Sequence, residues 1–384
     1  RANKLICNID LVTDNSLTTA ERAQYKAEAK IFRAMVMFDM VRLWGDFPVI
    51  TTVADDITSE NIDEVYPQYF PKQNTELEAY QQIEKDLLDA VLYAPDNTPG
   101  NKTLFSKSVA RTLLAKIYAE KPLRDYTKVI QYCDEVKADG FDLVDDFSDL
   151  FGMNAAGTDA KMRNTKESIL EAQFTSGAGN WCTWMFGRDL VNWNNNFTWA
   201  KWVTPSRDLI SAFKQEGDEV RFKESIVYYD CNWSNYYPSD NYPFMYKCRS
   251  ANSSIIKYRY ADVLLLKAEA LIMQDTPDLE GAADIIDKVR DRAKLGALPT
   301  SVRSNKNAML NALLKERRLE LAFEGQRWFD LVRLDKVEEV MNAVYAKDSG
   351  RKAQIYTFDK NSYRLPIPQS VIDANDKIHQ NPGY

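Results

Sequence analysis

The chain has 384 residues, of which 45% are hydrophobic and 27% charged, a composition typical of a globular protein with a large core. Its formal net charge of −7 and its pI near 5.1 exclude a general nucleic-acid or anionic-membrane binder, because both need a basic face. No stretch has the apolar length of a membrane span. The five cysteines show no CxxC spacing, so they predict neither a zinc site nor a disulfide framework.

The N-terminal part is predicted to be helical. Thr18 and Glu21 form a capping box at the start of a long amphipathic helix over residues 18–44, and Gly45 ends it. Further helices are predicted at 75–94, 105–121 and 125–138. The last two form a pair as long as a tetratricopeptide unit of about 34 residues. Because the first residues already have a helical pattern with no cap, we expect the true N-terminus to lie upstream.

The middle of the chain has a different character. Residues 139–256 contain short β-like runs such as "SILEAQF", many Asn and Gly residues, and few long periodic segments. Helix pairs are predicted again at 257–274 with 279–293 and at 307–324 with 326–346. Gly325 separates the last two helices in a left-handed conformation. From Tyr363 the tail is predicted to be extended, because Pro366 and Pro368 disfavour a helix.

Three segments follow from this pattern, and we expect them to pack as one unit. They are an N-terminal helical-repeat part at 1–138, an irregular ligand-binding lobe at 139–256, and a C-terminal helical-repeat part with its tail at 257–384. Cys7 is predicted to be a buried helix residue. Cys231 and Cys248 flank an aromatic loop, and the sequence leaves open whether they form a disulfide.

Aromatic residues are concentrated between Trp181 and Tyr246, where 17 of 66 positions are aromatic, about twice the chain average of 12%. Many of them lie among Asn, Ser, Asp and Gly, so we expect some rings to be exposed rather than buried. An exposed ring offers an apolar platform for the C–H face of a sugar, and neighbouring amides can bond its hydroxyls. The predicted ligand-binding residues are Trp193, Trp199, Trp233, Tyr236, Tyr237, Trp181 and Trp184.

Two alternatives for the aromatic residues stay open. The rings can simply fill the core of the lobe, and the ligand site is then expected around Tyr66–Phe70 or in a segment upstream of this chain. The same chemistry also suits a peptide ligand.

No catalytic motif is found in the sequence, and we predict no cofactor, no metal and no enzyme activity. The only histidine, His379, is in the tail, which argues against His-based nucleophile activation and most metal-dependent hydrolysis. Carboxylate chemistry of the glycosidase type remains an alternative, because the aromatic window contains acidic residues, of which five are candidates. These are Asp189, Asp208, Glu216, Asp230 and Asp240. A calcium ion near Asp230–Asp240 also stays open, although the spacing of an EF-hand is lacking.

One conspicuous charged block is predicted to be structural. Glu316, Glu320 and Glu324 recur at one-turn spacing, with arginines nearby, as in an ion-pair ladder on a solvated or helix–helix face.

Four stretches together resemble the SusD/RagB family of outer-membrane nutrient-binding lipoproteins. They are "YKAEAKIFRAMVMFDMVRLWGDFPVI" at 25–50, "KYRYADVLLLKAEALI" at 257–272, "KERRLELAFEGQRWFDLVRL" at 315–334 and "RLPIPQSVIDANDKIHQNPGY" at 364–384. They occur in family order along the chain. The signal peptide, lipidated cysteine and first helix that normally precede the first stretch are not part of this sequence.

The resemblance implies a mainly α, SusD-like fold, with tetratricopeptide-like helix pairs as a scaffold and an irregular aromatic-rich lobe. It also implies a lipid-anchored position on the extracellular face of the outer membrane, with membrane contact only through an N-terminal anchor absent from this chain. The implied function is non-catalytic binding of glycans or oligosaccharides for a SusC-like TonB-dependent barrel transporter. The alternatives are a peptide binder of the same architecture, a helical glycoside hydrolase, and a plain tetratricopeptide scaffold for another protein. The sequence does not name the ligand.

Overall fold

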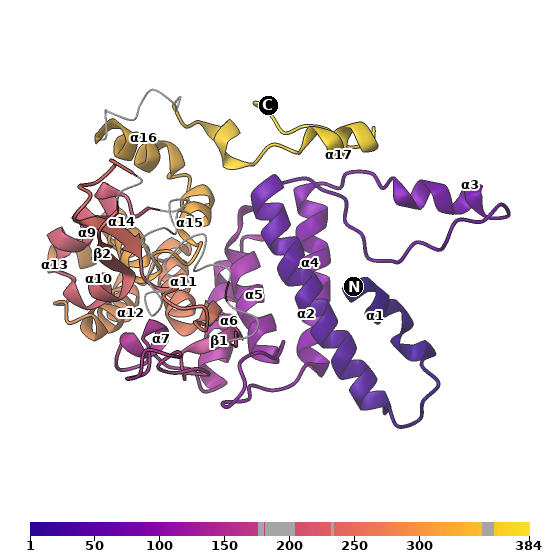
Figure 1. Ribbon diagram of the computed structural model, residues 1–384, viewed down its shortest axis with the longest axis horizontal. Coiled ribbons are helices and arrows are strands. Elements are labelled where there is room, and N and C mark those ends of the chain that lie inside the picture. Colours follow the sequence, from indigo (N-terminus) through magenta and orange to yellow (C-terminus); the bar gives the residue numbers. More distant parts are fainter. Residues whose placement is uncertain (176–179, 181–203, 232–233, 348–356) are drawn as a thin grey trace. The chain divides into compact units, whose positions relative to one another are not determined.

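The computed structural model describes residues 1–175, 180, 204–231, 234–347 and 357–384. The chain forms two compact units, each described here by itself. Unit 1 comprises Arg1–Asn97, Leu104–Tyr132 and Trp328–Tyr384, and unit 2 comprises Thr98–Thr103 and Cys133–Arg327. The predicted division at 138 and 256 follows sequence character rather than contacts, and it stays a prediction. The described residues are mainly helical, as predicted (Figure 1).

Unit 1 is built on two long helices that pack against each other, α2 (Thr19–Trp44) and α4 (Glu76–Tyr93). Both begin with a capping box, which confirms the predicted Thr18–Glu21 pair, and α2 ends at Gly45 with a φ of 71°. Phe38 is fully buried, and its ring meets Tyr80 edge-on at 6.2 Å between centroids. The α2–α4 interface therefore supplies a large part of the core of unit 1.

Short elements complete unit 1. Before α4 lie α1 (Ala2–Asn8), η1 (Ile9–Leu11), α3 (Ile62–Val65) and η2 (Tyr66–Tyr69). After it come α5 (Lys107–Ala119), η3 (Lys121–Leu123), the first part of α6 (Tyr126–Ala138), α15 (Arg327–Arg333), α16 (Val337–Lys347), η6 (Lys360–Tyr363) and α17 (Gln369–Ala374). None of the helices in the described ranges combines the length and the apolar character needed to cross a bilayer.

The predicted single helix over 326–346 is wrong, because it is broken between α15 and α16. Asp335 has a φ of 55°, and the amide of Lys336 bonds back to the carbonyl of Leu331 at 2.8 Å. This left-handed residue ends α15 as a glycine usually does. The tail prediction also needs a correction: α17 begins directly after Pro368, where proline costs no helical hydrogen bond.

Unit 2 contains three longer C-terminal helices that pack on one another. They are α11 (Tyr260–Met273), α12 (Leu279–Arg292) and α14 (Lys306–Glu320). Its shorter helices are α7 (Ser148–Phe151), α9 (Arg207–Glu216), α10 (Glu219–Ser225) and α13 (Thr300–Arg303). Gly325 has a φ of 74°, as predicted. These helices flank the irregular part of the unit.

Two small antiparallel sheets make up the β structure of the described residues. Strand β1 (Ser168–Ala172) forms where "SILEAQF" predicted a strand, and it pairs with β4 (Ile255–Arg259). The prediction of a helix starting at residue 257 was therefore early, because Arg259 still pairs with Ser168 and α11 starts one residue later. Strands β2 (Ile226–Tyr229) and β3 (Tyr242–Met245) form a hairpin.

The charged block in α14 is buried rather than solvated. Glu320 is 0% exposed and forms ion pairs with Arg221, Arg259 and Arg292. Burial alone would raise the pKa of Glu320, but the three guanidinium groups hold that pKa well below its ordinary value. The structural role predicted for the block is confirmed, but the pairs belong to the class of buried ion pairs, whose disruption costs several times more than that of a surface pair.

Two predictions about cysteines can be compared with the structure. Cys7 lies in α1 as expected, but its side chain is exposed, so its predicted burial is wrong. No disulfide joins Cys231 to Cys248. Both are buried thiols, and the Cys248 sulfur accepts a hydrogen bond from the Asn180 amide at 3.1 Å.

Candidate ligand-binding site

Of the seven predicted ligand-binding residues, the structure describes two, Tyr236 and Tyr237. The five tryptophans lie outside the described residues: Trp181, Trp184, Trp193, Trp199 and Trp233. The candidate site is therefore built here from the β2–β3 hairpin of unit 2 and the residues around it.

The hairpin loop, residues 230–241, is held closed at its base. Strands β2 and β3 pair from Ile226 opposite Met245 to Tyr229 opposite Tyr242. Beyond the last pair, the amide of Cys231 donates to the carbonyl of Ser239 at 2.6 Å. The described part of the loop thus starts from a fixed stem.

The two tyrosines of the loop lie against each other, and both are half-buried. Their ring centroids are 4.7 Å apart and the rings are inclined at 71°. The Tyr237 hydroxyl donates to the carbonyl of Pro205 at 2.9 Å, and the ring of Tyr237 meets Tyr242 edge-on at 5.6 Å. Burial raises the pKa of Tyr237, so its hydroxyl stays a neutral donor at physiological pH. Both rings pack against buried Cys231, Tyr242 and Phe244, and the additional hydrogen bond to Pro205 makes Tyr237 mainly a packing residue.

Arg207, which the sequence did not single out, belongs to the same group of side chains. Its guanidinium carbon lies 3.9 Å from the ring centroid of Tyr236 and 4.9 Å from that of Tyr237. It also donates a hydrogen bond to the Tyr236 carbonyl. A cation over two aromatic faces holds the rings in place by a cation–π interaction. The only sequence signal is a basic residue at the first position of α9, where the helix dipole disfavours a positive charge.

An open depression of about 810 Å³ lies at this loop. A ligand the size of an oligosaccharide fragment fits such a volume. Ser234, Asn235 and Ser239 share its lining with Tyr236. The arrangement offers an apolar platform with hydrogen-bonding groups around it. The lining residues are Cys231, Ser234, Asn235, Tyr236, Tyr237, Pro238 and Ser239.

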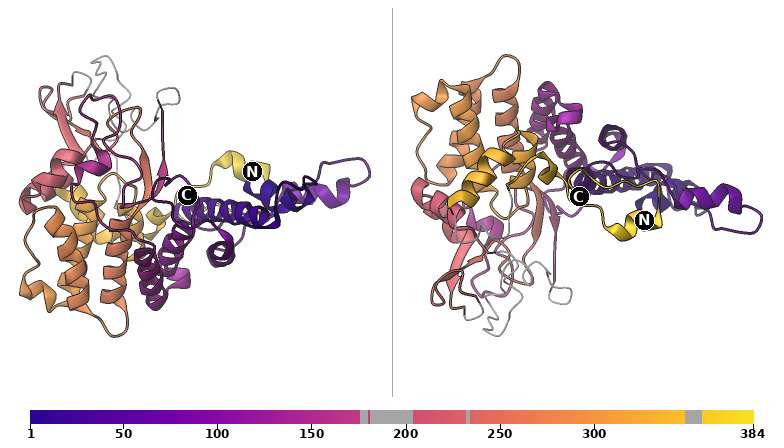
Figure 2. Two further views of the ribbon diagram at one scale, coloured as in Figure 1. Left: turned by 90° about the horizontal axis from the view of Figure 1, so that it is seen from below. Right: turned by 90° about the horizontal axis from the view of Figure 1, so that it is seen from above.

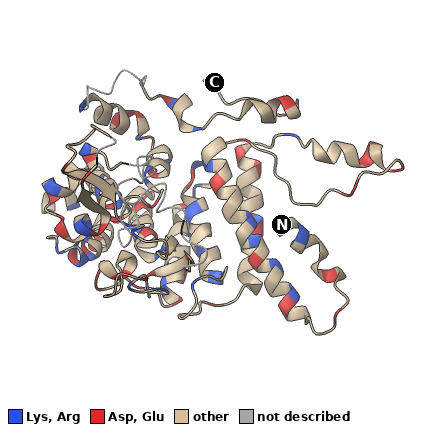
Figure 3. Cartoon of the chain, in the orientation of Figure 1, with Lys and Arg blue, Asp and Glu red and all other residues tan. Residues whose placement is uncertain are grey.

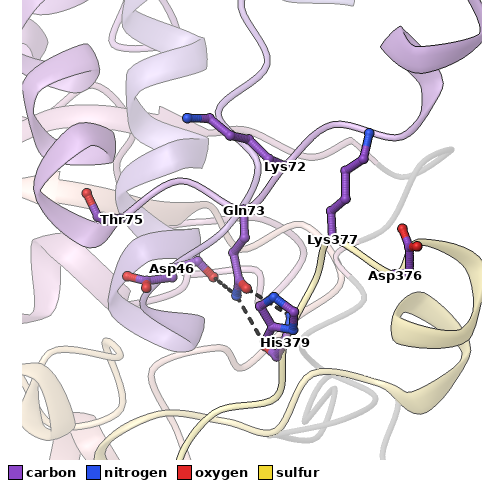
Figure 4. Close-up of a pocket in the computed structure, with 7 residues that line it drawn as sticks. All are labelled: Asp46, Lys72, Gln73, Thr75, Asp376, Lys377 and His379. Atoms are coloured by element: carbon purple, nitrogen blue, oxygen red, sulfur yellow. Dashed lines mark hydrogen bonds between the residues drawn. The ribbon is translucent and has the colours of Figure 1, made fainter.

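A second depression, of about 540 Å³, lies in unit 1 and is polar (Figure 4). Gln73 donates to the carbonyls of Asp46 and His379, at 3.0 and 3.3 Å, and accepts from the His379 amide at 2.9 Å. The Asp46 carboxylate accepts from the amide of Glu76 at 2.7 Å. These hydrogen bonds connect the C-terminal tail to the segment that begins α4. We therefore assign this depression a structural role rather than a ligand-binding one.

Two of the acidic residues considered for hydrolysis are engaged in ion pairs. Asp208 pairs with Arg318 at 2.7 Å, and Glu216 pairs with Arg290 at 2.7 Å and with Lys315. Asp189 lies outside the described residues. Within the described ranges, no group of three or more His, Cys, Asp or Glu side chains is placed to hold a metal ion.

The fold and this loop define a class, that of helical-repeat proteins carrying an aromatic hairpin lobe. Comparisons with known proteins give the family. A model of the SusD family matches residues 240–384, and a model described as "Starch-binding associating with outer membrane" matches residues 1–119. The chain belongs to the SusD/RagB family.

Relatives agree with this assignment over the whole length of the chain. SusD-like protein P2 of Formosa agariphila is 28% identical, over 100% of this chain and 78% of the relative. A solved SusD superfamily protein from Parabacteroides distasonis has a TM-score of 0.78 at 23% identity, over 100% of this chain and 83% of the other. A solved laminarin-binding SusD-like protein has a TM-score of 0.74 at 24% identity, with the same coverage. These structures show the SusD-like fold, and the names of the matches associate the family with carbohydrate binding and the outer membrane.

Proposed function

We propose that the chain binds glycans or oligosaccharides without catalysing their hydrolysis. The observation that carries the proposal is the half-buried ring of Tyr236, fixed by Arg207 at 3.9 Å and bordered by Ser234, Asn235 and Ser239 in an open depression. Sugars present an apolar C–H face and a rim of hydroxyls, and this lining offers the matching apolar and polar groups. The laminarin-binding neighbour supports the same class of ligand.

In addition to Tyr236, the five tryptophans named above remain proposed ligand contacts. Tyr237 keeps a supporting role in the proposal, because its hydroxyl and ring are engaged with Pro205 and Tyr242. A peptide ligand is the second candidate, since an aromatic ring beside amides also suits a peptide.

The cellular setting belongs to the same proposal. Family membership supports a position on the extracellular face of the outer membrane through an N-terminal lipid anchor, and delivery of the ligand to a SusC-like TonB-dependent barrel transporter. Co-purification of the membrane-bound protein with a barrel transporter would test this partnership directly.

The test of ligand class is a binding screen of the purified chain against neutral polysaccharides, polyuronates and peptides, with chromatography of every bound glycan after prolonged incubation. We expect binding to a glycan and no release of shorter sugars. Sustained release that disappears in Asp230→Asn or Asp240→Asn would instead establish a hydrolase, and binding of peptides alone would establish the second candidate.

A further inference from the structure

An arm, defined here as residues 51–71, connects α2 to α4 and carries α3 and η2. It runs away from the two long helices of unit 1 in all views (Figures 1 and 2). Its base is fastened on both sides. The Val49 amide donates to the side chain of Asn74 at 3.0 Å, and the Asn375 side chain donates to the carbonyl of Pro71 at 2.8 Å. The arm is thus a projecting segment on a fixed base.

Two tyrosines at the arm stand on one side of it. Tyr66 and Tyr69 are the first and last residues of η2, a 3₁₀ helix, in which side chains three residues apart eclipse each other. Tyr66 is 53% exposed and Tyr69 is 49% exposed, while Val65 just before them is buried. Two partly exposed tyrosines therefore lie at positions on the same side of this short helix.

Both rings are held in place rather than free to rotate. The Tyr69 hydroxyl donates to the carbonyl of Asp55 at 3.0 Å, and the ring of Tyr66 lies 4.8 Å from that of Phe70. Asn61 stabilises the loop that precedes α3. Its side chain accepts a hydrogen bond from the Thr58 amide at 2.7 Å and donates one to the Asp56 carbonyl at 3.1 Å. Ordered side chains lose less conformational entropy on binding, so the pair is pre-organised for a ligand.

The charge of the arm restricts the kind of ligand. Five acidic residues and no Lys or Arg lie between residues 51 and 71 (Figure 3). They are Asp55, Asp56, Glu60, Asp63 and Glu64. Like charges repel at short range, so uronate-rich or sulfated chains are disfavoured along the arm, although the Lys377 amine lies at its base and donates to the Phe70 carbonyl at 3.1 Å.

We propose that Tyr66 and Tyr69 form a second carbohydrate-binding platform, which takes a neutral pyranose oligosaccharide. The platform lies in unit 1, whereas the hairpin loop with Tyr236 lies in unit 2. The inference rests on the proposed function, because it assumes that the chain binds glycans. Exposed Ile57 and Ile62 lie in the same arm and would suit a protein partner, which the experiment below separates from a sugar.

The test is calorimetric titration of a short neutral β-glucan oligosaccharide into the whole chain and into Tyr66→Ala/Tyr69→Ala. Tyr93→Ala is the matched control, because Tyr93 is also 53% exposed but lies at the end of α4. We expect two classes of site in the unchanged chain and in the control, and one in the double variant. Tyr66→Ala alone should weaken the arm site about fivefold, the worth of one stacked ring. A polyuronate of equal length should not compete for the arm site at low ionic strength.

The outcomes separate the two proposals. If the unchanged chain binds the oligosaccharide and the double variant binds it identically, the platform is refuted, glycan binding stands, and the arm is left as a protein-facing surface. If the unchanged chain binds no glycan in the screen, the proposed function fails and the platform fails with it. Equal melting temperatures of all variants would show that an affinity loss is not a folding defect.

Discussion

The charged end of α14 and the aromatic hairpin loop stand out equally in the sequence, yet the structure uses them differently. Glu320 is fully buried and forms ion pairs with three arginines, so its charge is balanced inside unit 2. Tyr236 is half-buried and lines a depression of about 810 Å³ together with Ser234, Asn235 and Ser239. Recognisable motifs of a family can thus mark the scaffold, while the candidate binding residues lie in a less regular segment.

The largest effect should come from the buried charge. Glu320→Gln keeps the shape of the side chain but leaves Arg221, Arg259 and Arg292 with one counter-charge fewer, which should lower the free energy of unfolding by about 3–5 kcal/mol. Glu339→Gln is the control, because the exposed Glu339–Lys336 pair should contribute less than about 1 kcal/mol. Urea unfolding measures both. Equal losses in the two variants would contradict the distinction between buried and surface pairs.

An apolar truncation beside Glu320 should cost somewhat less. Leu321 is 4% exposed, so Leu321→Ala leaves a cavity and should lower the free energy of unfolding by about 2–5 kcal/mol. Glycan affinity should not change in the folded variant, because Leu321 lies in the scaffold. A large loss of glycan affinity with an unchanged melting temperature would show that Leu321 contributes to the binding site rather than to the scaffold.

Within the loop, the two tyrosines should separate. Tyr237→Ala removes the hydrogen bond to Pro205 and the contact with Tyr242, and should cost about 1–3 kcal/mol of stability. Tyr236→Ala should cost less, about 1 kcal/mol, because the guanidinium over its ring belongs to the exposed Arg207. Thermal unfolding of both variants is the measurement. If Tyr236→Ala is the more damaging change, Tyr236 is a core residue.

A further effect concerns pH. Burial lowers the pKa of Lys247 from 10.5 to about 8, although its amine donates to Glu324 at 2.6 Å and to the Glu320 carbonyl at 2.9 Å. Between those two pH values the unfolded chain holds a proton on Lys247 that the folded chain lacks, so unfolding takes up a proton and stability rises with pH. Lys247→Met should lack this rise. Parallel curves for the two proteins between pH 8 and pH 10 would show that Lys247 stays charged in the fold.

Local signals predicted much of the scaffold. The Thr18–Glu21 capping box, the Gly45 stop and the left-handed Gly325 all depend on residues within one turn of each other, and all three are confirmed. The break at Asp335 was missed because a non-glycine residue adopts the left-handed conformation there.

Burial and pairing were less accessible, because they depend on residues far apart in the chain. The partners of Glu320 come from α10, β4 and α12, so its local pattern could not show that it is buried. In the same way, the sequence treated Tyr236 and Tyr237 alike, and the contacts of Tyr237 with Pro205 and Tyr242 depend on the fold. The position of Arg207 over the Tyr236 ring likewise required the fold.

The most direct test of glycan binding at the hairpin loop is a calorimetric titration of Tyr236→Ala with the best glycan from the screen, against the unchanged chain. Loss of one stacked ring, on the order of 1 kcal/mol, should weaken binding about five- to tenfold at an unchanged melting temperature. Tyr93→Ala is the control, because it removes an exposed ring elsewhere in the chain, and its glycan affinity should equal that of the unchanged chain. Identical affinities of Tyr236→Ala and the unchanged chain would contradict the account.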